Sequence, residues 1–284
     1  MKQITPAALR RWVLPAPGDD KHARGDVVVL GGAARSPGAV MLAGLAALRV
    51  GAGRLTLGVA GSVAAQVAVA VPESGVIPLE ETKAGHIRAG VMDAAADDLA
   101  GADAVLLGPG LDHPAKAADM VEALPPFLGP DTIVVLDAFA LGALSGIADA
   151  AEPLRGRLVL TPNRQELSKL IDGPVDDLHS AVRSASALYG AVVTCYGMVA
   201  HPDGRSWQAP DSGNGLATSG SGDVLAGAVT GLAARGASPE QAAVWATWMH
   251  IRAGARLEKR IAPLGYLAHE LLDELPALLA APAD

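Results

Sequence analysis

Aromatic side chains, cysteine and clustered positive charge are all scarce in this chain of 284 residues. Only 3% of the residues are Phe, Trp or Tyr, whereas 50% are hydrophobic and 33 are glycine. The hydrophobic content excludes a disordered chain, which lacks the apolar surface that folding must bury. Small apolar residues punctuated by glycine and proline are typical of a large α/β domain with closely packed helices and tight loops.

The single cysteine, Cys195, limits the chemistry further. One thiol can form neither an internal disulfide nor a structural zinc site, so we expect a buried small side chain rather than a nucleophile. Residues 1–6 lack the apolar run of a secretory signal, and the longest apolar stretch, residues 59–71, is too short to span a bilayer. We therefore expect a soluble, cytoplasmic protein without a membrane partner.

The charge balance is acidic, with 30 Asp and Glu residues against 22 Lys and Arg, a formal net charge of −8. No run of basic residues occurs, which argues against a general nucleic-acid surface. A small anionic ligand is still compatible with this balance. Backbone N–H groups at a helix N-terminus can bind an anion without any basic side chain.

Short apolar runs alternate with alanine-rich helical segments along the chain. The run at residues 26–30 ends at two glycines and is apolar on both faces, as a buried parallel strand requires. Similar runs predict strands at 54–59, 104–107, 133–136, 158–160 and 191–194. This alternation predicts a doubly wound, three-layer α/β/α fold with a central, mainly parallel sheet. No long linker divides the sequence, so we expect one domain over residues 1–284.

Capping and turn residues predict several further elements. A short helix is expected within residues 4–12, and Ser36 with Pro37 should begin a longer one. The Asp203-Gly204 pair predicts a hairpin turn, which would add a small antiparallel piece at the edge of the sheet. Ser238 opens the pattern Ser-Pro-Glu-Gln, which predicts the start of the final helix through a capping box.

Five unusual loops follow the predicted strands. In open α/β sheets, ligands bind beyond the carboxyl ends of the strands. Any one of these loops is better explained by glycine and proline turning the chain, but five at equivalent positions favour a shared ligand crevice. The loops are Gly31–Ala33, Gly108–Asp112, Asp137–Ala138, Thr161–Glu166 and Cys195–Gly197.

The strongest local signal is a polar, glycine-rich loop that leads directly into an apolar helical pattern at residues 214–227. Gly220, Ser221 and Gly222 would present backbone N–H groups at the positive end of that helix, where an anion can bind. Asp223 follows in the first turn. A carboxylate beside bound phosphate suits a general base that deprotonates an attacking hydroxyl. The alternative is an acidic residue that merely begins a helix, because Gly-x-Gly-Asp alone is common.

The sequence Gly-Ser-Gly-Asp-Val-Leu-Ala-Gly at 220–227, preceded by Gly-Leu-Ala-Thr, resembles the C-terminal signature of the ribokinase-like superfamily. Within that superfamily the chain most resembles the NAD(P)H-hydrate dehydratases, over nearly its whole length. The most discriminating element is Ala-Ala-Leu-Arg-Val-Gly-Ala-Gly at 46–53. Further matching stretches are residues 21–27, 31–32, 37–39 and 108–111.

This resemblance implies a ribokinase-like fold and an enzyme that uses ADP or ATP, ADP being typical of bacterial members. The substrate would be hydrated NADH or NADPH, whose ring hydroxyl is phosphorylated before phosphate leaves by elimination. Phosphate is a much better leaving group than hydroxide. The resemblance also implies Mg²⁺ bridging the phosphates. It leaves the oligomeric state open, although small-residue helices permit the close subunit packing of a homo-oligomer.

The resemblance assigns roles to individual residues. Asp223 matches the general base, which also contacts the substrate, and residues 220–222 match the anion hole that binds the transferring phosphoryl group. The segment Tyr196, Gly197 and Met198 matches a nucleotide-binding turn.

Four further residues match the substrate and metal regions. Ala39 and Gly110 match positions that line the hydrated-nicotinamide site. Asn163 and Glu166 form an Asn-x-x-Glu pattern that supports the metal and phosphates, with Glu166 acting through metal-bound water and Asn163 also at the substrate.

Four departures from the family pattern lie around the predicted crevice, one of which is a shortened segment at Met198–Ala200. Tyr196 replaces a lysine, Phe139 replaces a second aspartate after Asp137, and Asp112 replaces a glycine. A lysine would offer phosphate a point charge, whereas tyrosine offers a neutral hydroxyl or a stacking face. Asp223 and its glycine loop are unchanged, so we expect an active enzyme.

Two alternative functions remain. One is a kinase of the same superfamily that acts on a sugar or a vitamin-like alcohol, and the other is a catalytically silent nucleotide-binding protein. Among the remaining candidates, His22 is expected to pack or to form a hydrogen bond near the first strand. His250 is expected to be a structural histidine, and Trp245 and Trp248 to belong to the core or to a subunit interface.

Overall fold

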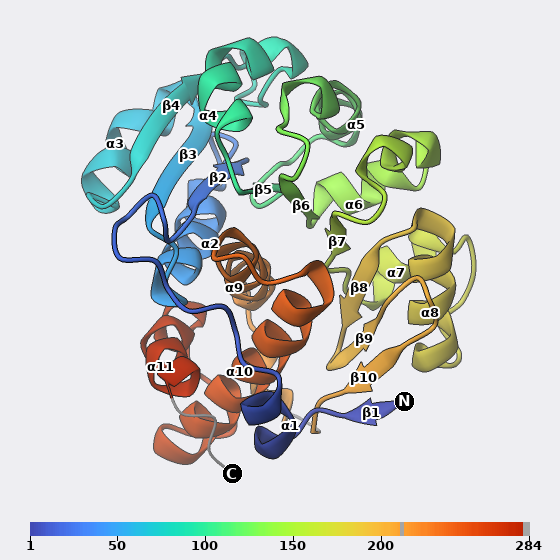
Figure 1. Cartoon of the computed structure of the whole chain (residues 1–284). Helices are drawn as coiled ribbons and strands as arrows, with labels where there is room; N and C mark the ends of the chain where they lie inside the picture. The colour runs from blue at the N-terminus through green and yellow to red at the C-terminus, as the bar shows by residue number, and fades with distance from the viewer. Residues whose placement is uncertain (211–212, 281–284) are drawn as a thin grey trace.

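A ten-stranded sheet forms the centre of the computed structural model, which describes residues 1–210 and 213–280 (Figure 1). The strands follow the order β1-β10-β9-β8-β7-β6-β5-β2-β3-β4. The seven strands from β8 to β4 are all parallel. Their bounds are β2 Asp26–Leu30, β3 Arg54–Ala60, β4 Gly75–Leu79, β5 Ala104–Leu107, β6 Ile133–Leu136, β7 Leu158–Leu160 and β8 Val192–Cys195.

Helices cover both faces of this sheet (Figure 1). Successive residues of β2 face opposite sides of the sheet: Val27 and Val29 pack in the core on one side, and Val28 and Leu30 pack in the core on the other. The predicted three-layer α/β/α fold is therefore confirmed. The first layer holds α1 Pro6–Arg11, α2 Pro37–Arg49, α3 Ala64–Ala70, α9 Ser221–Ala234, α10 Pro239–Arg260 and α11 Ala268–Ala280. The second holds α4 Ala96–Ala100, α5 Pro114–Ala123, α6 Phe139–Leu144, α7 Arg164–Leu170 and α8 Leu178–Tyr189.

Short 3₁₀ helices join several of these elements. They are η1 Gly61–Val63, η2 Ala89–Ala95, η3 Pro125–Phe127, η4 Ala148–Leu154 and η5 Asn214–Leu216. Within the described residues, none of the helices is both long and apolar enough to cross a membrane.

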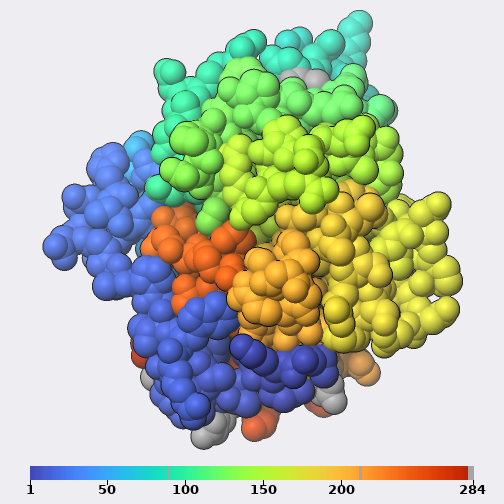
Figure 2. All heavy atoms as spheres, turned by 45° about the vertical axis from the view of Figure 1, so that its right-hand side comes forward, coloured from blue at the N-terminus to red at the C-terminus, as the bar shows by residue number. Residues whose placement is uncertain are grey.

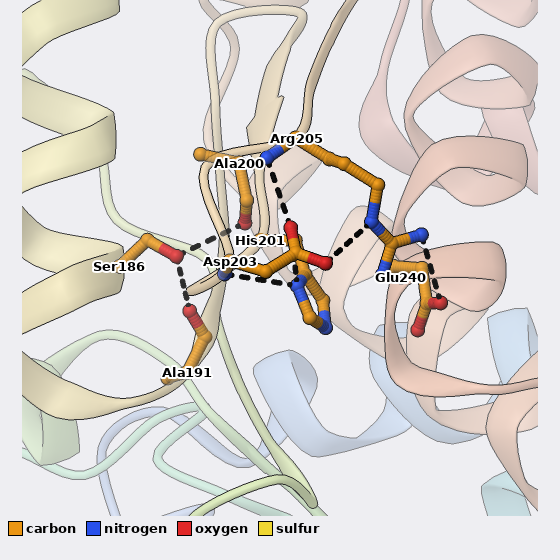
Figure 3. A network of polar contacts seen from close by, with 7 residues as sticks. All are labelled: Ser186, Ala191, Ala200, His201, Asp203, Arg205 and Glu240. Atoms are coloured by element: carbon orange, nitrogen blue, oxygen red, sulfur yellow. Dashed lines mark hydrogen bonds and ion pairs between the residues drawn. The ribbon is translucent and has the colours of Figure 1, made fainter.

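One edge of the sheet consists of β9 (Met198–Ala200), β10 (Ser206–Gln208) and the short β1 (Lys2–Gln3). Strand β9 pairs antiparallel with β8 and β10, whereas β1 pairs parallel with β10. The hairpin predicted at Asp203-Gly204 is confirmed. At its turn, Arg205 Nε lies 2.7 Å from Asp203 Oδ2 and Arg205 Nη1 lies 3.5 Å from Glu240 Oε1 of α10, which ties the hairpin to the first helix layer (Figure 3).

The N-terminal segment packs against this edge, although the two are far apart in the sequence (Figure 2). Trp12 stacks on Trp207 with ring centroids 5.8 Å apart, and the Trp12 carbonyl accepts a hydrogen bond from the Trp245 indole.

Most predicted strand bounds are confirmed. Residues 26–30, 104–107, 133–136 and 158–160 form strands with those bounds, whereas β3 ends one residue later than predicted and β8 lies one residue further along. Strands β1 and β4 were not predicted. Strand β4 contains Pro78, which weakens a strand signal but is tolerated at the edge of a sheet.

The predicted helix starts are mostly confirmed. The first helix is shorter than the predicted range 4–12, because β1 precedes it and Thr5 caps it. Ser238 caps α10 by accepting from the Gln241 N–H, but the prediction that this is the final helix is wrong. Helix α11 follows it, with Pro276 inside its own apolar pattern.

Close contact between α2 and α9 depends on two glycines of α9. A Cβ atom at Gly227 would lie 2.0 Å from the Ala43 carbonyl oxygen, and one at Gly231 would lie 2.5 Å from that of Ala47. Backbone therefore meets backbone along this contact, and no larger residue fits without moving a helix. The contact fixes where the N-terminus of α9 lies over the sheet.

We expect Gly227→Ala to lower the free energy of unfolding by about 1–3 kcal/mol, because overpacking against backbone outweighs the gain in helix propensity. Gly142→Ala in α6 is the matched control, since nothing lies within 4 Å of its added Cβ. That variant should be neutral or more stable by up to about 1 kcal/mol. Urea unfolding of both variants checks the prediction, and equal stability of the two would contradict it.

Candidate active site

The order of the strands reverses between β2 and β5, and the two loops that follow these strands meet there. The chain runs from β2 through β3 to β4 on one side, and from β5 through β6 and β7 to β8 on the other. The Gly32 N–H donates to the Pro109 carbonyl at 2.8 Å, and the Ala33 N–H donates to the Gly110 carbonyl at 2.9 Å. Such a switch point is where ligands bind in open α/β sheets.

Gly110 joins this pair of loops to the start of α2. It has a φ of +70°, and a Cβ there would lie 2.3 Å from the Ser36 carbonyl oxygen. Ser36 precedes α2, whose first turn contains Ala39. The two residues predicted to line the nicotinamide site, Ala39 and Gly110, therefore lie on neighbouring segments at the switch point.

Three carboxyl groups from different elements lie within electrostatic reach of one another. Burial and the nearby charge of Glu166 raise the pKa of Asp223, in the first turn of α9, to about 6. Burial and the charge of Asp223 raise the pKa of Asp137, directly after β6, to about 8. Burial also raises the pKa of Glu166, in the first turn of α7. The structure thus brings Asp223 and Glu166 together and adds Asp137 to them.

Sequence reasoning noted Asp137 within a loop but gave it no role. The available signal was an acidic residue directly after a strand that is apolar on both faces, at the edge where the other loops gather. Thr161 Oγ1 lies 2.8 Å from Asp137 Oδ1 and 3.2 Å from the Leu136 carbonyl oxygen. A hydroxyl has a single hydrogen, so both contacts are satisfied when Asp137 is protonated and donates to Thr161.

The Asn-x-x-Glu pattern forms a capping box at the start of α7. Asn163 Oδ1 accepts from the N–H groups of Gln165 and Glu166 at 2.8 and 3.0 Å, and Glu166 Oε2 accepts from the Asn163 N–H at 2.9 Å. The pattern therefore shapes the helix start, and one carboxylate oxygen of Glu166 takes no part in the box. Direct contact of Asn163 with a substrate stays a prediction.

The donor set suits Mg²⁺ held largely through its water shell. Carboxylate oxygens are the ligands that Mg²⁺ prefers, and it usually retains several waters. The ion's charge would relieve the repulsion among Asp137, Glu166 and Asp223. Across residues 1–210 and 213–280, however, no group of three His, Cys, Asp or Glu side chains is placed to hold a metal directly.

The N-terminus of α9 has the geometry of an anion site. Gly220 occupies the N-cap with a φ of 90° and supplies no side-chain cap. The N–H groups of Gly222 and Asp223 are in the first helical turn, where no intrahelical acceptor is available to them. These donors are therefore free to bind a phosphate. Of the residues predicted to form the anion hole, Gly222 has such a free N–H, whereas the Ser221 N–H donates to the Thr218 carbonyl at 3.2 Å.

The predicted nucleotide-binding residues Tyr196 and Gly197 form the two-residue turn between β8 and β9, with φ values of 46° and 81°. The side chain of Tyr196 is exposed, whereas that of Met198 is buried in the core, so only the backbone of Met198 could contact a nucleotide. A Cβ at Gly197 would lie 3.1 Å from Ile251, the residue after His250 in α10.

The departures from the family pattern have structural counterparts. Asp112 Oδ1 lies 2.8 Å from His86 Nδ1, so the replaced glycine gives an ion pair between two loops when that histidine is protonated. Phe139 begins α6 and, with Ala138, lines a cavity of about 150 Å³ that also reaches Glu166. Ala138 and Tyr196 both have positive φ although neither is glycine, a strain that clusters at functional sites.

Most of the remaining candidates behave as expected. Cys195 is buried, as predicted, and burial raises the pKa of its thiol to about 12. Trp245 and Trp248 belong to the core. The expectation that His22 packs or forms a hydrogen bond is wrong: its side chain is exposed, and its ring lies 3.8 Å from Asp26 at the start of β2, too far for a hydrogen bond. His250 is buried as predicted, but it contacts Ser221 of the anion site.

Comparisons with known proteins agree with this geometry. A family model described as NAD(P)H-hydrate dehydratase matches residues 27–277. The ADP-dependent (S)-NAD(P)H-hydrate dehydratase of Xanthomonas campestris is 43% identical over 98% of this chain and 96% of its own length. The bifunctional NAD(P)H-hydrate repair enzyme Nnr of Moorella thermoacetica is 34% identical over 90% of this chain, which spans about half (49%) of that longer relative.

Solved structures show the same fold. The ADP/ATP-dependent NAD(P)H-hydrate dehydratase of Bacillus subtilis, co-crystallised with ATP and Mg²⁺, superposes with a TM-score of 0.79 at 26% identity, covering 98% of both chains. A ribokinase-like superfamily protein from Enterococcus faecalis superposes with a TM-score of 0.84 at 21% identity, covering 99% of this chain and 95% of its own.

We expect the ionisation of Asp137 to lower the stability of the protein as pH rises from about 4 to about 8. The pKa of Asp137 is raised from its ordinary 3.8 to about 8, so between these values the folded protein holds a proton that the unfolded chain has lost. Asp137→Asn removes this linkage. The variant should gain in free energy of unfolding over the wild type by up to about 1.4 kcal/mol per pH unit across the window. Urea unfolding at a series of pH values measures the difference.

The exposed Asp176→Asn serves as the control and should follow the wild-type pH dependence. A constant difference between Asp137→Asn and the wild type across this range would contradict a protonated Asp137.

Proposed function

Because the chain belongs to the NAD(P)H-hydrate dehydratase family, which has the ribokinase-like fold, we propose that it regenerates NADH and NADPH from their hydrated forms. ADP or ATP would supply the phosphoryl group. The observation that carries the proposal is the position of Asp223. It is a half-buried carboxylate with a raised pKa, in the first turn of a helix whose N-terminus is free to bind phosphate.

In the proposed reaction, the Asp223 carboxylate takes the proton of the ring hydroxyl, and the hydroxyl oxygen attacks the terminal phosphorus of the nucleotide. The bond to the leaving nucleotide oxygen breaks, and AMP leaves when ADP is the donor. The N–H groups at the start of α9 bind the oxygens of the transferring group, where negative charge gathers. The ring carbon–oxygen bond then breaks, phosphate departs with that electron pair, and loss of a proton from the neighbouring carbon restores the double bond.

The other carboxyl groups have supporting roles in this proposal. Glu166, with Asp137 beside it, would hold Mg²⁺ through water, and the ion would supply positive charge to the phosphates. Without a bound metal ion, the raised pKa of Asp137, about 8, keeps this group mostly protonated at pH 7, which spares Asp223 a second close negative charge. Ala39, Gly110 and Asn163 would line the substrate, and the turn at Tyr196 and Gly197 would contact the nucleotide.

We further propose that residues 1–284 act as one domain in the cytoplasm. The strand pairing of β1 with β10 joins the beginning of the chain to its second half. The acidic net charge of −8 disfavours nucleic acid as a partner, which leaves the dinucleotide substrate and the nucleoside phosphate. No specific observation favours the alternative kinase. Pyridoxal kinase from Staphylococcus aureus superposes with a TM-score of 0.53, but at 14% identity this likeness shows a shared fold and not a shared activity.

The purified protein should restore the absorbance of NADH when it is given hydrated NADH with ADP or ATP. Asp223→Asn should lower turnover at least about a hundredfold, because the hydroxyl loses its general base. Asp273→Asn, an exposed aspartate of α11, should leave turnover unchanged. A stable phosphorylated product without NADH would identify a kinase. Stabilisation by nucleotide without any turnover would identify a silent binding protein, and full activity of Asp223→Asn would refute the assignment of the base.

The pH dependence of kcat/KM should follow the ionisation of Asp223. Its pKa of about 6 makes the carboxylate, the form that accepts a proton, predominant above that pH. Activity should therefore rise about tenfold per pH unit below pH 6 and level off above it. A profile that falls between pH 5 and 7 would require a protonated catalytic group instead.

A further inference from the structure

His250 reaches from the interior of α10 to the first residue of α9. Its side chain is buried, and its Nε2 atom lies 2.9 Å from Ser221 Oγ and also 2.9 Å from the Ser221 carbonyl oxygen. Ser221 lies between Gly220 and Gly222, whose backbone forms the anion site. The histidine therefore contacts the phosphate-binding helix end from the side of the core.

These two distances fix the tautomer of the ring. A carbonyl oxygen can only accept a hydrogen bond, so Nε2 must carry a hydrogen and donate it. Burial lowers the pKa of His250 to about 4, so the ring is neutral at ordinary pH. His250 is thus a neutral imidazole with its hydrogen on Nε2, and it adds no positive charge to the site.

The same hydrogen determines what the Ser221 hydroxyl can do. Because Nε2 carries its one hydrogen between the Ser221 carbonyl and Oγ, the Ser221 hydroxyl cannot donate to Nε2, and the serine keeps its own O–H for another acceptor. Within residues 1–210 and 213–280, Ser221 Oγ has no other hydrogen-bond partner than His250. A buried hydroxyl hydrogen without an acceptor is unfavourable, and a phosphoryl oxygen at the helix end would satisfy it.

We propose that His250 is a positioning residue that holds Ser221 so that its hydroxyl donates to the phosphoryl group bound at the N-terminus of α9. This inference rests on the proposed function, because it names a further donor of the same anion site. The hydroxyl joins the backbone N–H groups there. It is oriented before the reaction begins, which is the condition under which a hydrogen-bond donor contributes most to catalysis.

Substitutions at both residues separate this role from a merely structural one. His250→Gln keeps an N–H donor in a position similar to that of Nε2, whereas His250→Leu keeps bulk but removes the donor. Ser221→Ala removes the hydroxyl but leaves the carbonyl that His250 also contacts. The experiment measures kcat, KM for ADP and the free energy of unfolding for these three variants and for His250→Leu combined with Ser221→Ala.

His250→Leu and Ser221→Ala should each lower kcat by about ten- to a hundredfold, less than the roughly hundred- to thousandfold loss from removing a whole oxyanion-hole donor, because the backbone N–H groups remain. His250→Gln should keep most of the activity. In the Ser221→Ala background, His250→Leu should lower kcat by less than about threefold, because the hydroxyl it positions is already absent. Its effect on stability should persist there, since the bond to the carbonyl is lost in either background.

The proposal is overturned if His250→Leu and His250→Gln lower kcat equally, or if the effect of His250→Leu is as large without the hydroxyl as with it. Wild-type turnover is measured first, and its absence would refute the proposed function instead. In that case ADP binding by calorimetry decides the inference. His250→Leu should then weaken binding more than His250→Gln, and only when Ser221 is present.

Discussion

The close contact between α2 and α9 is the constraint on which the rest of the site depends. Gly227 and Gly231 let the α9 backbone meet Ala43 and Ala47 of α2 without intervening side chains. Because helix α9 is rigid, this contact determines where its N-terminus lies above the carboxyl edge of the sheet. A composition rich in small residues and poor in aromatics makes this close approach of the two helices geometrically possible.

The electrostatics of the site follow from that placement. The helix end offers unpaired N–H groups without any cationic side chain, which reconciles an acidic protein with an anionic ligand. The same placement brings Asp223 close to Glu166, and Asp137 close to both, so that ionising all three carboxyl groups together is unfavourable. An ionised base beside a protonated neighbour is the arrangement that proton abstraction at neutral pH requires.

The sequence predicted the central strands well because each is apolar on both faces, a pattern that depends on local residues alone. It predicted Asp223 and its glycine loop for the same reason, since the helix start and the acid are adjacent in the chain. Strand β1 was missed because its two residues pair with residues of β10 that lie 205 positions further along the chain. Helix α11 was missed because Pro276 interrupts its pattern.

The contacts of Asp137 and His250 could not be read from the sequence, because each depends on which elements become neighbours. Asp137 gains its role from α9, and His250 contacts Ser221 across 29 positions of chain.

The central claim, that the site phosphorylates the ring hydroxyl before it leaves, is tested most directly by hydrated NADH whose ring hydroxyl contains heavy oxygen. Mass spectrometry of the products should find the label in inorganic phosphate, and label in water with unlabelled phosphate would contradict the account.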